Sequence, residues 1–329
     1  CMVKTRTAAE LGCRIVGSEM SISDSPVLHL LNNPKLDVTK GQERMNRTPR
    51  RRLFRQTLKV HDCITPATVF DPLSARMVED LGGQVGMLAG SVAAMSILGA
   101  PDKMLITASE FADMALRICR AGDLAVIADA DHGYGNAINV QRTIRELDHS
   151  GLAAITIEDT DLPQPFGSKE TRLLNIDEAV GKMRAAMSGR VDADLVILAR
   201  TSAATITGRD DCIARIQAYE KTGVDGITLI GARSLEDLTA LCATTDLPIM
   251  LGGIGSIAPK ADDLAKMGAR ICLRGHQPYL ASLAATYSAI QQVLGQANPD
   301  DAPPVIDSAI LRQLTREDGY DEDANQFLK

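Results

Sequence analysis

Three carboxylate residues, each placed at or just after an apolar run, have the clearest capacity for chemistry in this sequence. Asp129 and Asp131 lie two positions apart after one run, and Glu158 follows the next run. Residues two apart on an extended strand point to the same side, so both aspartates can face one site with Glu158. Such an oxygen-only set is typical of Mg²⁺ or Mn²⁺ held partly through water. The aspartates can equally cap the following helix, and spacing alone does not decide between the two interpretations.

Arg200 and His276 follow later apolar runs in the same way. An unpaired charge at the end of an apolar run is costly, so Arg200 predicts either a structural ion pair or an anchor for an anionic substrate. His276 alone is as consistent with a structural histidine as with a catalytic one. The segment Gly90-Ser91-Val92 follows another run and can present backbone N–H groups to a carboxylate, although this signal is weak by itself.

The elements that must position these residues alternate regularly from residue 60 onward. Eight short apolar runs span 63–70, 85–89, 125–128, 153–157, 195–199, 226–230, 248–251 and 271–273. The clearer helical segments span 74–81, 109–121, 136–150, 177–188, 210–222 and 234–244. Gly151, Gly223 and Gly268 stand where helix C-caps are needed before the next run. Eight such units without a G-x-G-x-x-G segment favour an α/β fold of the (β/α)₈ TIM-barrel class, whose chemistry sits at the C-terminal strand ends.

The length of 329 residues accommodates one such barrel with extensions at both ends. We expect residues 1–44 to be an N-terminal extension, which is a leader, a tag or a poorly ordered arm. Residues 45–298 are expected to form the catalytic barrel. Residues 299–329 are expected to form a C-terminal tail, with a short helix near 306–315 followed by a frayed end.

The composition and charge of the chain exclude some classes of binding partner and indicate its compartment. The net charge of −7 and the absence of Trp argue against nucleic-acid binding. The seven cysteines, without C-x-x-C, suit a reducing compartment, so we expect a cytoplasmic protein. The charge-free stretch 81–101 contains five glycines and is better explained by a strand, a loop and a helix start than by a membrane span. One basic cluster around Leu53 and Phe54 is interpreted as a solvated helix face: Arg50, Arg51, Arg52 and Arg55.

Five segments, taken in order, resemble the isocitrate lyase/phosphoenolpyruvate mutase superfamily. They are Val69-Phe-Asp-Pro-Leu-Ser-Ala-Arg76, Gly90-Ser91, Asp129-Ala-Asp-His-Gly-Tyr-Gly-Asn136, Ile157-Glu-Asp159 and Ala199-Arg200-Thr201. The match covers roughly residues 55–295 and is most specific in the third segment. The segment Glu158-Asp-Thr-Asp-Leu-Pro-Gln-Pro-Phe-Gly167 and the pair Gly275-His276 are most similar to the oxaloacetate decarboxylase-like branch.

The resemblance implies an assembly and a set of site residues. It implies a (β/α)₈ barrel whose last helix is swapped between two subunits, in a homotetramer that is a dimer of dimers. The implied metal ligands are Asp129 directly and Asp102, Asp131 and Glu158 through water. The residues implied to bind the small-molecule 2-oxo acid substrate are Ser91, Arg200 and His276, of which Arg200 and His276 are also the catalytic candidates.

The implied activity is that of a carboxy-lyase, the Mg²⁺-dependent decarboxylation of oxaloacetate to pyruvate and CO₂. A 2-oxo acid chelates Mg²⁺ or Mn²⁺, and the metal acts as a Lewis acid on the carbonyl group. Loss of the distal carboxylate leaves pyruvate enolate, whose negative charge the metal and Arg200 stabilise. His276 positions the leaving carboxylate or takes part in proton delivery.

Other enzymes of the superfamily are the nearest alternatives, namely a phosphonopyruvate mutase or hydrolase and a 2-methylisocitrate-type lyase. The carbon–carbon lyases carry a catalytic cysteine in a K-[KR]-C-G-H loop. The corresponding loop here, residues 159–175, contains none, which disfavours thiol acid–base chemistry but leaves a candidate lid. Ile254 stands where decarboxylase-like relatives are expected to carry tyrosine, which leaves another 2-oxo acid open as the substrate. A binding protein without activity is disfavoured because the four acidic residues, Arg200 and His276 are all present.

Overall fold

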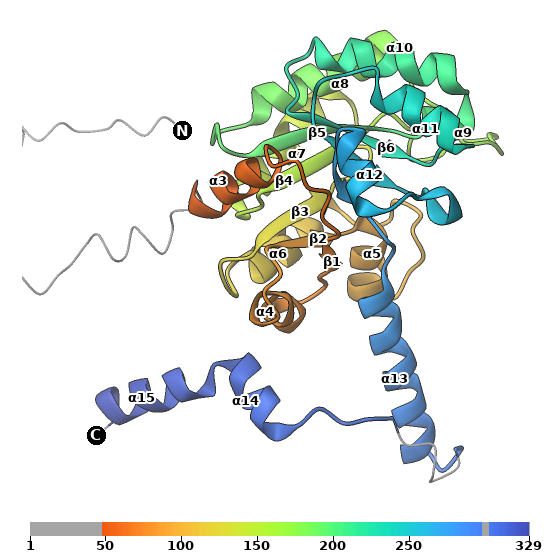
Figure 1. Ribbon diagram of the computed structural model, residues 1–329. Helices are drawn as coiled ribbons and strands as arrows, with labels where there is room; N and C mark the ends of the chain where they lie inside the picture. Colours follow the sequence, from red (N-terminus) through yellow and green to blue (C-terminus); the bar gives the residue numbers. More distant parts are fainter. Residues whose placement is uncertain (1–47, 298–302, 329) are drawn as a thin grey trace, which may run out of the picture. The chain divides into compact units, whose positions relative to one another are not determined.

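The computed structural model describes residues 48–297 and 303–328, and its strands and helices alternate along the chain (Figure 1). The expected N-terminal extension, residues 1–44, lies outside the described residues. Eight strands pair in chain order, every neighbouring pair being parallel. Their bounds are β1 Ala67–Thr68, β2 Val85–Leu88, β3 Ala125–Asp129, β4 Ala154–Glu158, β5 Val196–Thr201, β6 Gly226–Ile230, β7 Ile249–Gly252 and β8 Ala269–Cys272.

A bridge just before β1 connects the two ends of the sheet. Ile64 pairs in parallel with Ile271 of β8, and the backbone N–H groups of Ile64 and Cys272 donate to Arg270 and Ile64 respectively. Closure of a sheet in this way removes its free edges. The expected (β/α)₈ class is therefore confirmed, and each of the eight expected apolar runs contains or overlaps a strand.

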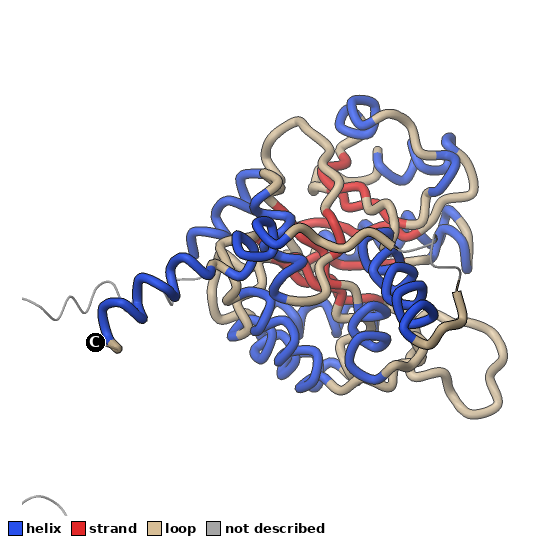
Figure 2. The backbone as a smooth tube through the Cα atoms, turned by 90° about the horizontal axis from the view of Figure 1, so that it is seen from below, coloured by secondary structure: helices blue, strands red, loops and turns tan. Residues whose placement is uncertain are grey.

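Helices surround the strands on the outside of the sheet (Figure 2). They are α4 Pro72–Asp80, α5 Gly90–Leu98, α6 Ala108–Cys119, α7 Ala137–His149, α8 Ile176–Gly189, α9 Ala203–Ile206, α10 Arg209–Glu220, α11 Leu235–Cys242 and α12 Ala261–Lys266, with a 3₁₀ turn at Gly255–Ile257. Thr107 and Asn136 cap α6 and α7 in capping boxes, which fixes where these helices begin. The charge-free stretch 81–101 holds β2 and α5, as expected. No helix within residues 48–297 and 303–328 is long and apolar enough to cross a membrane.

A helix that precedes the first strand closes the N-terminal end of the barrel. This helix, α3 (Thr48–Thr57), buries Phe54 completely among the inward-facing side chains of the strands, including Val85, Ile127 and Val196. Burial of such an aromatic side chain contributes about 1.5–3 kcal/mol.

Three of the four arginines of the basic cluster on α3 do not form the solvated helix face that was expected, and Arg52 alone is exposed. Arg51 is 1% exposed and pairs with Asp148 at 2.9 Å and with Asp192 at 2.7 Å. The Arg51 Nε donates to the carbonyl oxygen of Leu152, just before β4, at 2.8 Å. These carbonyl and carboxylate groups are covered by α3, so the arginines replace water as their hydrogen-bond donors.

Arg51→Met is expected to lower the free energy of unfolding by about 3–5 kcal/mol, because it removes the cation from a buried ion pair. Arg52→Met is the matched control, since Arg52 lies one residue away, is 69% exposed and pairs with Asp194. Its loss is expected to be below about 1 kcal/mol. Urea unfolding followed by circular dichroism measures both, and equal losses would show that the burial of Arg51 has no energetic consequence.

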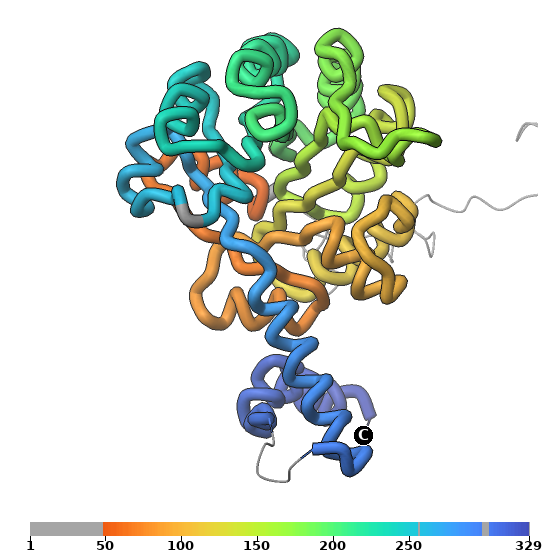
Figure 3. The backbone as a smooth tube through the Cα atoms, turned by 90° about the vertical axis from the view of Figure 1, so that its right-hand side faces the viewer, coloured from red at the N-terminus to blue at the C-terminus, as the bar shows by residue number. Residues whose placement is uncertain are grey.

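The C-terminal tail is ordered over most of its described part. After the long helix α13 (Gln277–Val293), the expected short helix is present as α14 (Ser308–Thr315), and Arg76 donates to the carbonyl of Leu314. The expected frayed end is wrong, because α15 (Glu317–Phe327) follows directly. Arg312 of α14 pairs with three acidic residues of α15, which joins the two helices: Glu317, Asp318 and Asp321. Figure 3 shows α13 extending away from the barrel.

Candidate active site

A cavity of about 330 Å³ lies where β4 and β5 end, together with the turn after β3. In a (β/α)₈ enzyme this end of the barrel carries the chemistry. Its lining contains five carboxyl and two basic side chains. The lining residues are Asp102, Lys103, Met104, Asp131, Glu158, Thr160, Asp161, Leu162, Gln164, Glu170, Thr171, Arg200, Ser202 and Ile206.

The register of three neighbouring strands brings the central side chains together. Asp129 of β3 lies opposite Thr156 of β4, and Glu158 of β4 lies opposite Arg200 of β5. The Thr156 hydroxyl donates to Asp129 Oδ1 at 2.7 Å. The Arg200 guanidinium pairs with Asp129 through Nη1 and with Glu158 Oε2 through Nη2, the latter at 3.0 Å. Of the two interpretations left open for Arg200, the structure shows the ion pair.

Asp131 reaches the site by a route other than strand alternation. β3 ends at Asp129, and Asp131 lies in the following turn with φ of +47°. Its Oδ1 is 4.0 Å from Arg200 Nη1, while its buried Oδ2 has no hydrogen-bond partner among the residues that the structure describes. A Cβ atom at Gly90 would lie 2.2 Å from that Oδ2, so glycine is required for this approach. The alternative of helix capping by the aspartates is wrong, because Asn136 caps α7.

Burial is the largest single influence on the pKa of each of these groups. Burial raises the pKa of Asp131 well above its usual value; Asp129 raises it further, and Arg200 opposes the shift. Burial likewise raises the pKa of Glu158, and that of Asp102 with a further contribution from Asp129. For Arg200, burial alone would lower the pKa, but Asp129, Glu158 and Asp131 together raise it. Arg200 therefore stays charged and neutralises part of the acidic cluster.

Ser91 and His276 adjoin this cluster without lining the cavity. Ser91 is in the first turn of α5, next to Gly90. His276 is the N-cap residue of α13, and its Nδ1 is 3.1 Å from the Thr68 hydroxyl oxygen. Burial lowers the pKa of His276 and Asp129 partly offsets this, so the ring is neutral at pH 7.

The outcome for the expected site residues is thus uneven. Four of the expected residues line the cavity: Asp102, Asp131, Glu158 and Arg200. Asp129 does not line it but forms an ion pair with Arg200, which does. Ser91 and His276 lie at the edge of the site. Ile254 is buried and lies outside the lining.

Several lining and contact residues were missed from the sequence. Thr156 could have been predicted from the sequence, because it lies two positions before Glu158 on the same strand and so shares its face. Lys103 directly follows Asp102 and has no periodic or motif signal of its own. Asp159 turns away from the cavity and is fully buried, accepting from the Tyr219 hydroxyl at 2.5 Å.

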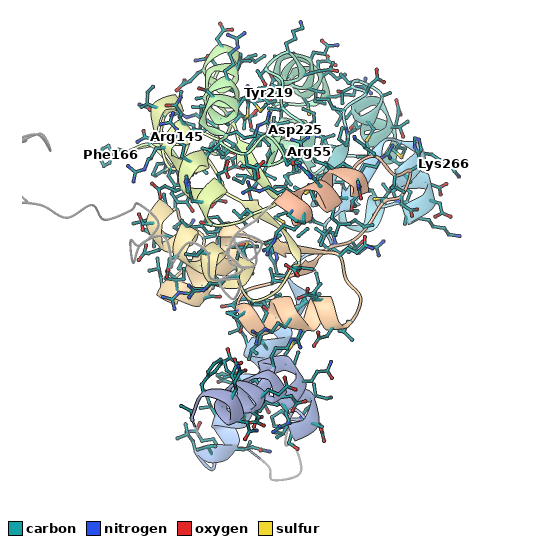
Figure 4. The ribbon with its side chains drawn as sticks, turned by 90° about the vertical axis from the view of Figure 1, so that its left-hand side faces the viewer. Arg55, Arg145, Phe166, Tyr219, Asp225 and Lys266 are labelled. Atoms are coloured by element: carbon teal, nitrogen blue, oxygen red, sulfur yellow. The ribbon has the colours of Figure 1, made fainter. Side chains whose placement is uncertain are left out.

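The loop after β4 forms one wall of the cavity. Thr160 pairs with Leu173 in an antiparallel bridge, which holds the two ends of the loop together. Residues between them line the cavity, and none of the lining residues is a cysteine. Phe166 at the tip is fully exposed and projects from the barrel (Figure 4). This is the loop expected to act as a lid.

His132, between Asp131 and Tyr134, predicts a pH dependence of stability. Burial lowers its pKa to about 4, with a smaller contribution from Lys182. Its Nδ1 has no hydrogen-bond partner within residues 48–297 and 303–328. The unfolded chain takes up a proton as the pH falls through about 6.5, whereas the folded protein does so only near pH 4. Stability is therefore expected to fall by about 3 kcal/mol between these pH values.

Urea midpoints at pH 7 and pH 4.5 measure this effect of His132. His132→Gln removes the titrating group while keeping a polar side chain of similar size. The variant is expected to lose less stability than the parent between the two pH values. An unchanged difference would assign the pH dependence to other groups.

Comparison with known proteins places this geometry in a family. The family model described as phosphoenolpyruvate phosphomutase matches residues 54–294. A protein of Rhodopseudomonas palustris (strain BisA53) named oxaloacetate decarboxylase is 44% identical over 279 residues, which cover 85% of this chain and 96% of that protein.

Solved structures agree with this placement. An oxaloacetate acetylhydrolase in complex with the inhibitor 3,3-difluorooxalacetate has a TM-score of 0.72 at 28% identity, covering 84% of this chain and 96% of that one. A phosphonopyruvate hydrolase in complex with oxalate and Mg²⁺ has a TM-score of 0.73 at 23% identity, covering 85% and 99%, and shares the fold. The chain therefore belongs to the phosphoenolpyruvate phosphomutase family, within the isocitrate lyase/phosphoenolpyruvate mutase superfamily, and is an enzyme of the lyase type.

Proposed function

We propose that this enzyme decarboxylates oxaloacetate to pyruvate and CO₂ with the help of a divalent cation, Mg²⁺ or Mn²⁺. The observation that carries the proposal is the acidic cavity in which Arg200 lies among Asp129, Asp131 and Glu158. The relative named oxaloacetate decarboxylase also supports the proposal, because the match covers 96% of that protein.

The residues present fit a divalent cation. The donors are carboxylate oxygens, which Mg²⁺ and Mn²⁺ prefer, and the buried Oδ2 of Asp131 lacks a partner. Five carboxyl groups and only two basic groups line the cavity, so a dianionic substrate needs additional positive charge there. In the part of the chain that the structure describes, no three His, Cys, Asp or Glu side chains are already arranged around a metal position. We assign Asp129 as the direct ligand and Asp102, Asp131 and Glu158 as ligands through water.

The side chains of this site divide the remaining work. A bound cation supplies Lewis acidity at the 2-oxo group. The C3–C4 bond of oxaloacetate breaks, its electron pair forms the enolate of pyruvate, CO₂ leaves, and C3 then takes up a proton. Arg200 offers its unpartnered Nε–H to the developing negative charge. The loop of residues 160–173 excludes water from the enolate.

We assign His276 to the edge of the site where a proton is needed. The Thr68 hydroxyl is 3.3 Å from the carbonyl oxygen of Gly275 and donates to it, so its oxygen accepts from the Nδ1–H of His276. This tautomer leaves Nε2 of the neutral ring free to hold or pass on a proton. Ser91 and the first N–H groups of α5 are assigned to the substrate carboxylate.

The cavity disfavours the other reactions of the superfamily that need a thiol. Among the described residues no cysteine lines it, so a 2-methylisocitrate-type lyase would lack its acid–base group here. Phosphonopyruvate chemistry stays an alternative, because it uses the same acidic and anion-binding groups.

We also propose that α13 is exchanged between two subunits of a homotetramer. Tyr279 is the one residue of this helix that is buried, and its exposed apolar side chains include Leu280, Leu283, Tyr287, Ile290 and Val293. Such a row of apolar groups is typical of a subunit interface. Analytical ultracentrifugation tests this, and a monomer at micromolar concentration would contradict it.

Pyruvate formation from oxaloacetate in the presence of Mg²⁺ tests the proposed reaction. Free Mg²⁺ itself promotes decarboxylation, so the controls are Mg²⁺ without enzyme and the Asp129→Ala variant. A rate well above both controls is expected. A rate equal to that of Mg²⁺ alone would overturn the proposal, and phosphonopyruvate and branched malates would then be tested with the same protein.

A further inference from the structure

We infer that Arg200 is an internal cation that competes with the divalent cation for the acidic site, and that its displacement frees it to bind the anionic substrate. This inference rests on the proposed function. It assigns to one side chain two successive partners, the carboxylates in the free enzyme and the substrate in the complex.

The first argument is that Arg200 already uses the oxygens that a cation needs. Asp129 has two carboxylate oxygens, of which Oδ1 accepts from Thr156 at 2.7 Å and Oδ2 pairs with Arg200. Each oxygen keeps a second lone pair, so a cation can bind Asp129, but at Oδ2 it then lies next to the guanidinium group that already uses that oxygen. Glu158 is held in the same way, with its Oε2 at 3.0 Å from Arg200 Nη2.

The second argument comes from two buried atoms that lack partners in the same site. Asp131 Oδ2 is an unpaired acceptor, and Arg200 Nε–H is an unpaired donor. A buried polar atom without a partner costs about 1–3 kcal/mol, so each atom favours an incoming ligand of opposite character. The acceptor suits the water shell of a cation, and the donor suits a carboxylate of a 2-oxo acid.

The third argument is charge balance. A guanidinium group and a divalent cation cannot share the same carboxylates without mutual repulsion, which is strong in a poorly solvated site. An anionic substrate relieves that repulsion, because the guanidinium group then pairs with the substrate while the cation binds the carboxylates. Binding of the cation and binding of the anion therefore strengthen each other, and the effect is reciprocal.

Isothermal titration calorimetry with Mn²⁺ alone, and with oxalate at saturating Mn²⁺, tests the inference without turnover. Arg200→Gln removes the internal cation, so Mn²⁺ is expected to bind about 10-fold tighter, a gain of about 1.4 kcal/mol. Oxalate is expected to bind at least about 10-fold more weakly, because the guanidinium donors are absent. A residue with only a structural role would weaken both ligands, and a plain substrate anchor would leave Mn²⁺ affinity unchanged.

Arg172→Gln is the matched control. Arg172 pairs at 3.2 Å with Asp161, which lines the same cavity, and it does not touch Asp129 or Glu158. Its loss changes the charge at the cavity rim to the same extent, and Mn²⁺ affinity is expected to change less than about 2-fold, as for an exposed pair. An equal gain in both variants would attribute the effect to net charge and overturn the inference.

The remaining outcomes separate this inference from the proposed function. Unchanged or weaker Mn²⁺ binding by a folded Arg200→Gln variant overturns the competition. If that variant does not fold, Arg200→Lys replaces it, and an intermediate gain in Mn²⁺ affinity is expected because lysine keeps the charge but not the two-pronged contact. If Arg200→Gln binds Mn²⁺ more tightly and oxalate more weakly, but the parent enzyme does not turn over oxaloacetate, only the proposed substrate is overturned. Absence of Mn²⁺ binding in all variants would overturn both.

Discussion

Replacing Asp129 with asparagine is expected to lower kcat/KM for oxaloacetate by at least about 10³-fold, equivalent to about 4 kcal/mol of transition-state stabilisation. The substitution keeps the shape of the side chain but removes the charge that we assign to direct cation ligation. The fold is expected to persist, because Arg200 keeps its contact with Glu158 at 3.0 Å. Initial rates of pyruvate formation measure the effect, after subtraction of the rate with Mg²⁺ alone.

Asp113→Asn provides the comparison for Asp129→Asn. Asp113 lies on the exposed surface of α6, where it pairs with Arg117 one helical turn away. Such a pair contributes only a few tenths of a kcal/mol to the stability of the helix. The activity of this variant is therefore expected to stay within 2-fold of the parent, equivalent to about 0.4 kcal/mol of activation free energy. A loss of less than 10-fold in Asp129→Asn would mean that Asp129 is not the direct ligand.

Removal of divalent cations is expected to abolish enzymatic decarboxylation while leaving the fold intact. The chemical effect is large, again at least about 10³-fold, because the cavity then lacks the Lewis acid that polarises the 2-oxo group. The structural effect is small, because Arg200 already neutralises Asp129 and Glu158 in the free enzyme. Rates after chelation and dialysis, followed by far-ultraviolet circular dichroism, separate the two effects.

Re-addition of Mg²⁺ or Mn²⁺ completes this experiment. Activity is expected to return, and the melting temperature to rise with cation concentration, since a ligand at 100 times its Kd adds about 2.7 kcal/mol of stability. Full activity after thorough chelation would contradict the assigned role of the cation. Loss of helical signal on chelation would contradict the assigned role of Arg200.

The barrel was predictable from the sequence because its strands are buried on both faces and read as short apolar runs. β6 shows this most plainly, since its bounds, Gly226–Ile230, coincide with the expected run. β1 was harder: the expected run of residues 63–70 contains a strand of two residues and a separate bridge at Ile64. A periodic pattern marks burial and does not reveal where backbone pairing is interrupted.

Tertiary partners account for what the sequence did not predict on α3. Arg51 looks like a surface residue within its own helix, yet its carboxylate partners Asp148 and Asp192 lie 97 and 141 positions away in the chain. The pairing depends on α3 lying across the N-terminal end of the barrel, which local patterns do not encode. Arg51, which was expected to be solvated, is therefore buried.

The site was predictable in its residue types and less so in its geometry. Its position at the end of an apolar run identified Glu158 correctly, and alternation would have added Thr156, because both residues lie on β4. Asp131 escapes alternation, since its φ of +47° takes it off the strand. The partners of Arg200 follow from strand register, and register requires the assembled sheet.

The most direct test of the central claim is the fate of carbon 4 of ¹³C-labelled oxaloacetate, followed by NMR with Mg²⁺ and enzyme. Decarboxylation releases this carbon as CO₂ and bicarbonate while pyruvate accumulates, and both are expected at a rate far above that with Asp129→Asn. Cleavage of the C2–C3 bond by water would instead place the label in acetate and form oxalate. The appearance of labelled acetate, or of pyruvate no faster than with Mg²⁺ alone, would contradict the assignment of this cavity as a decarboxylase site.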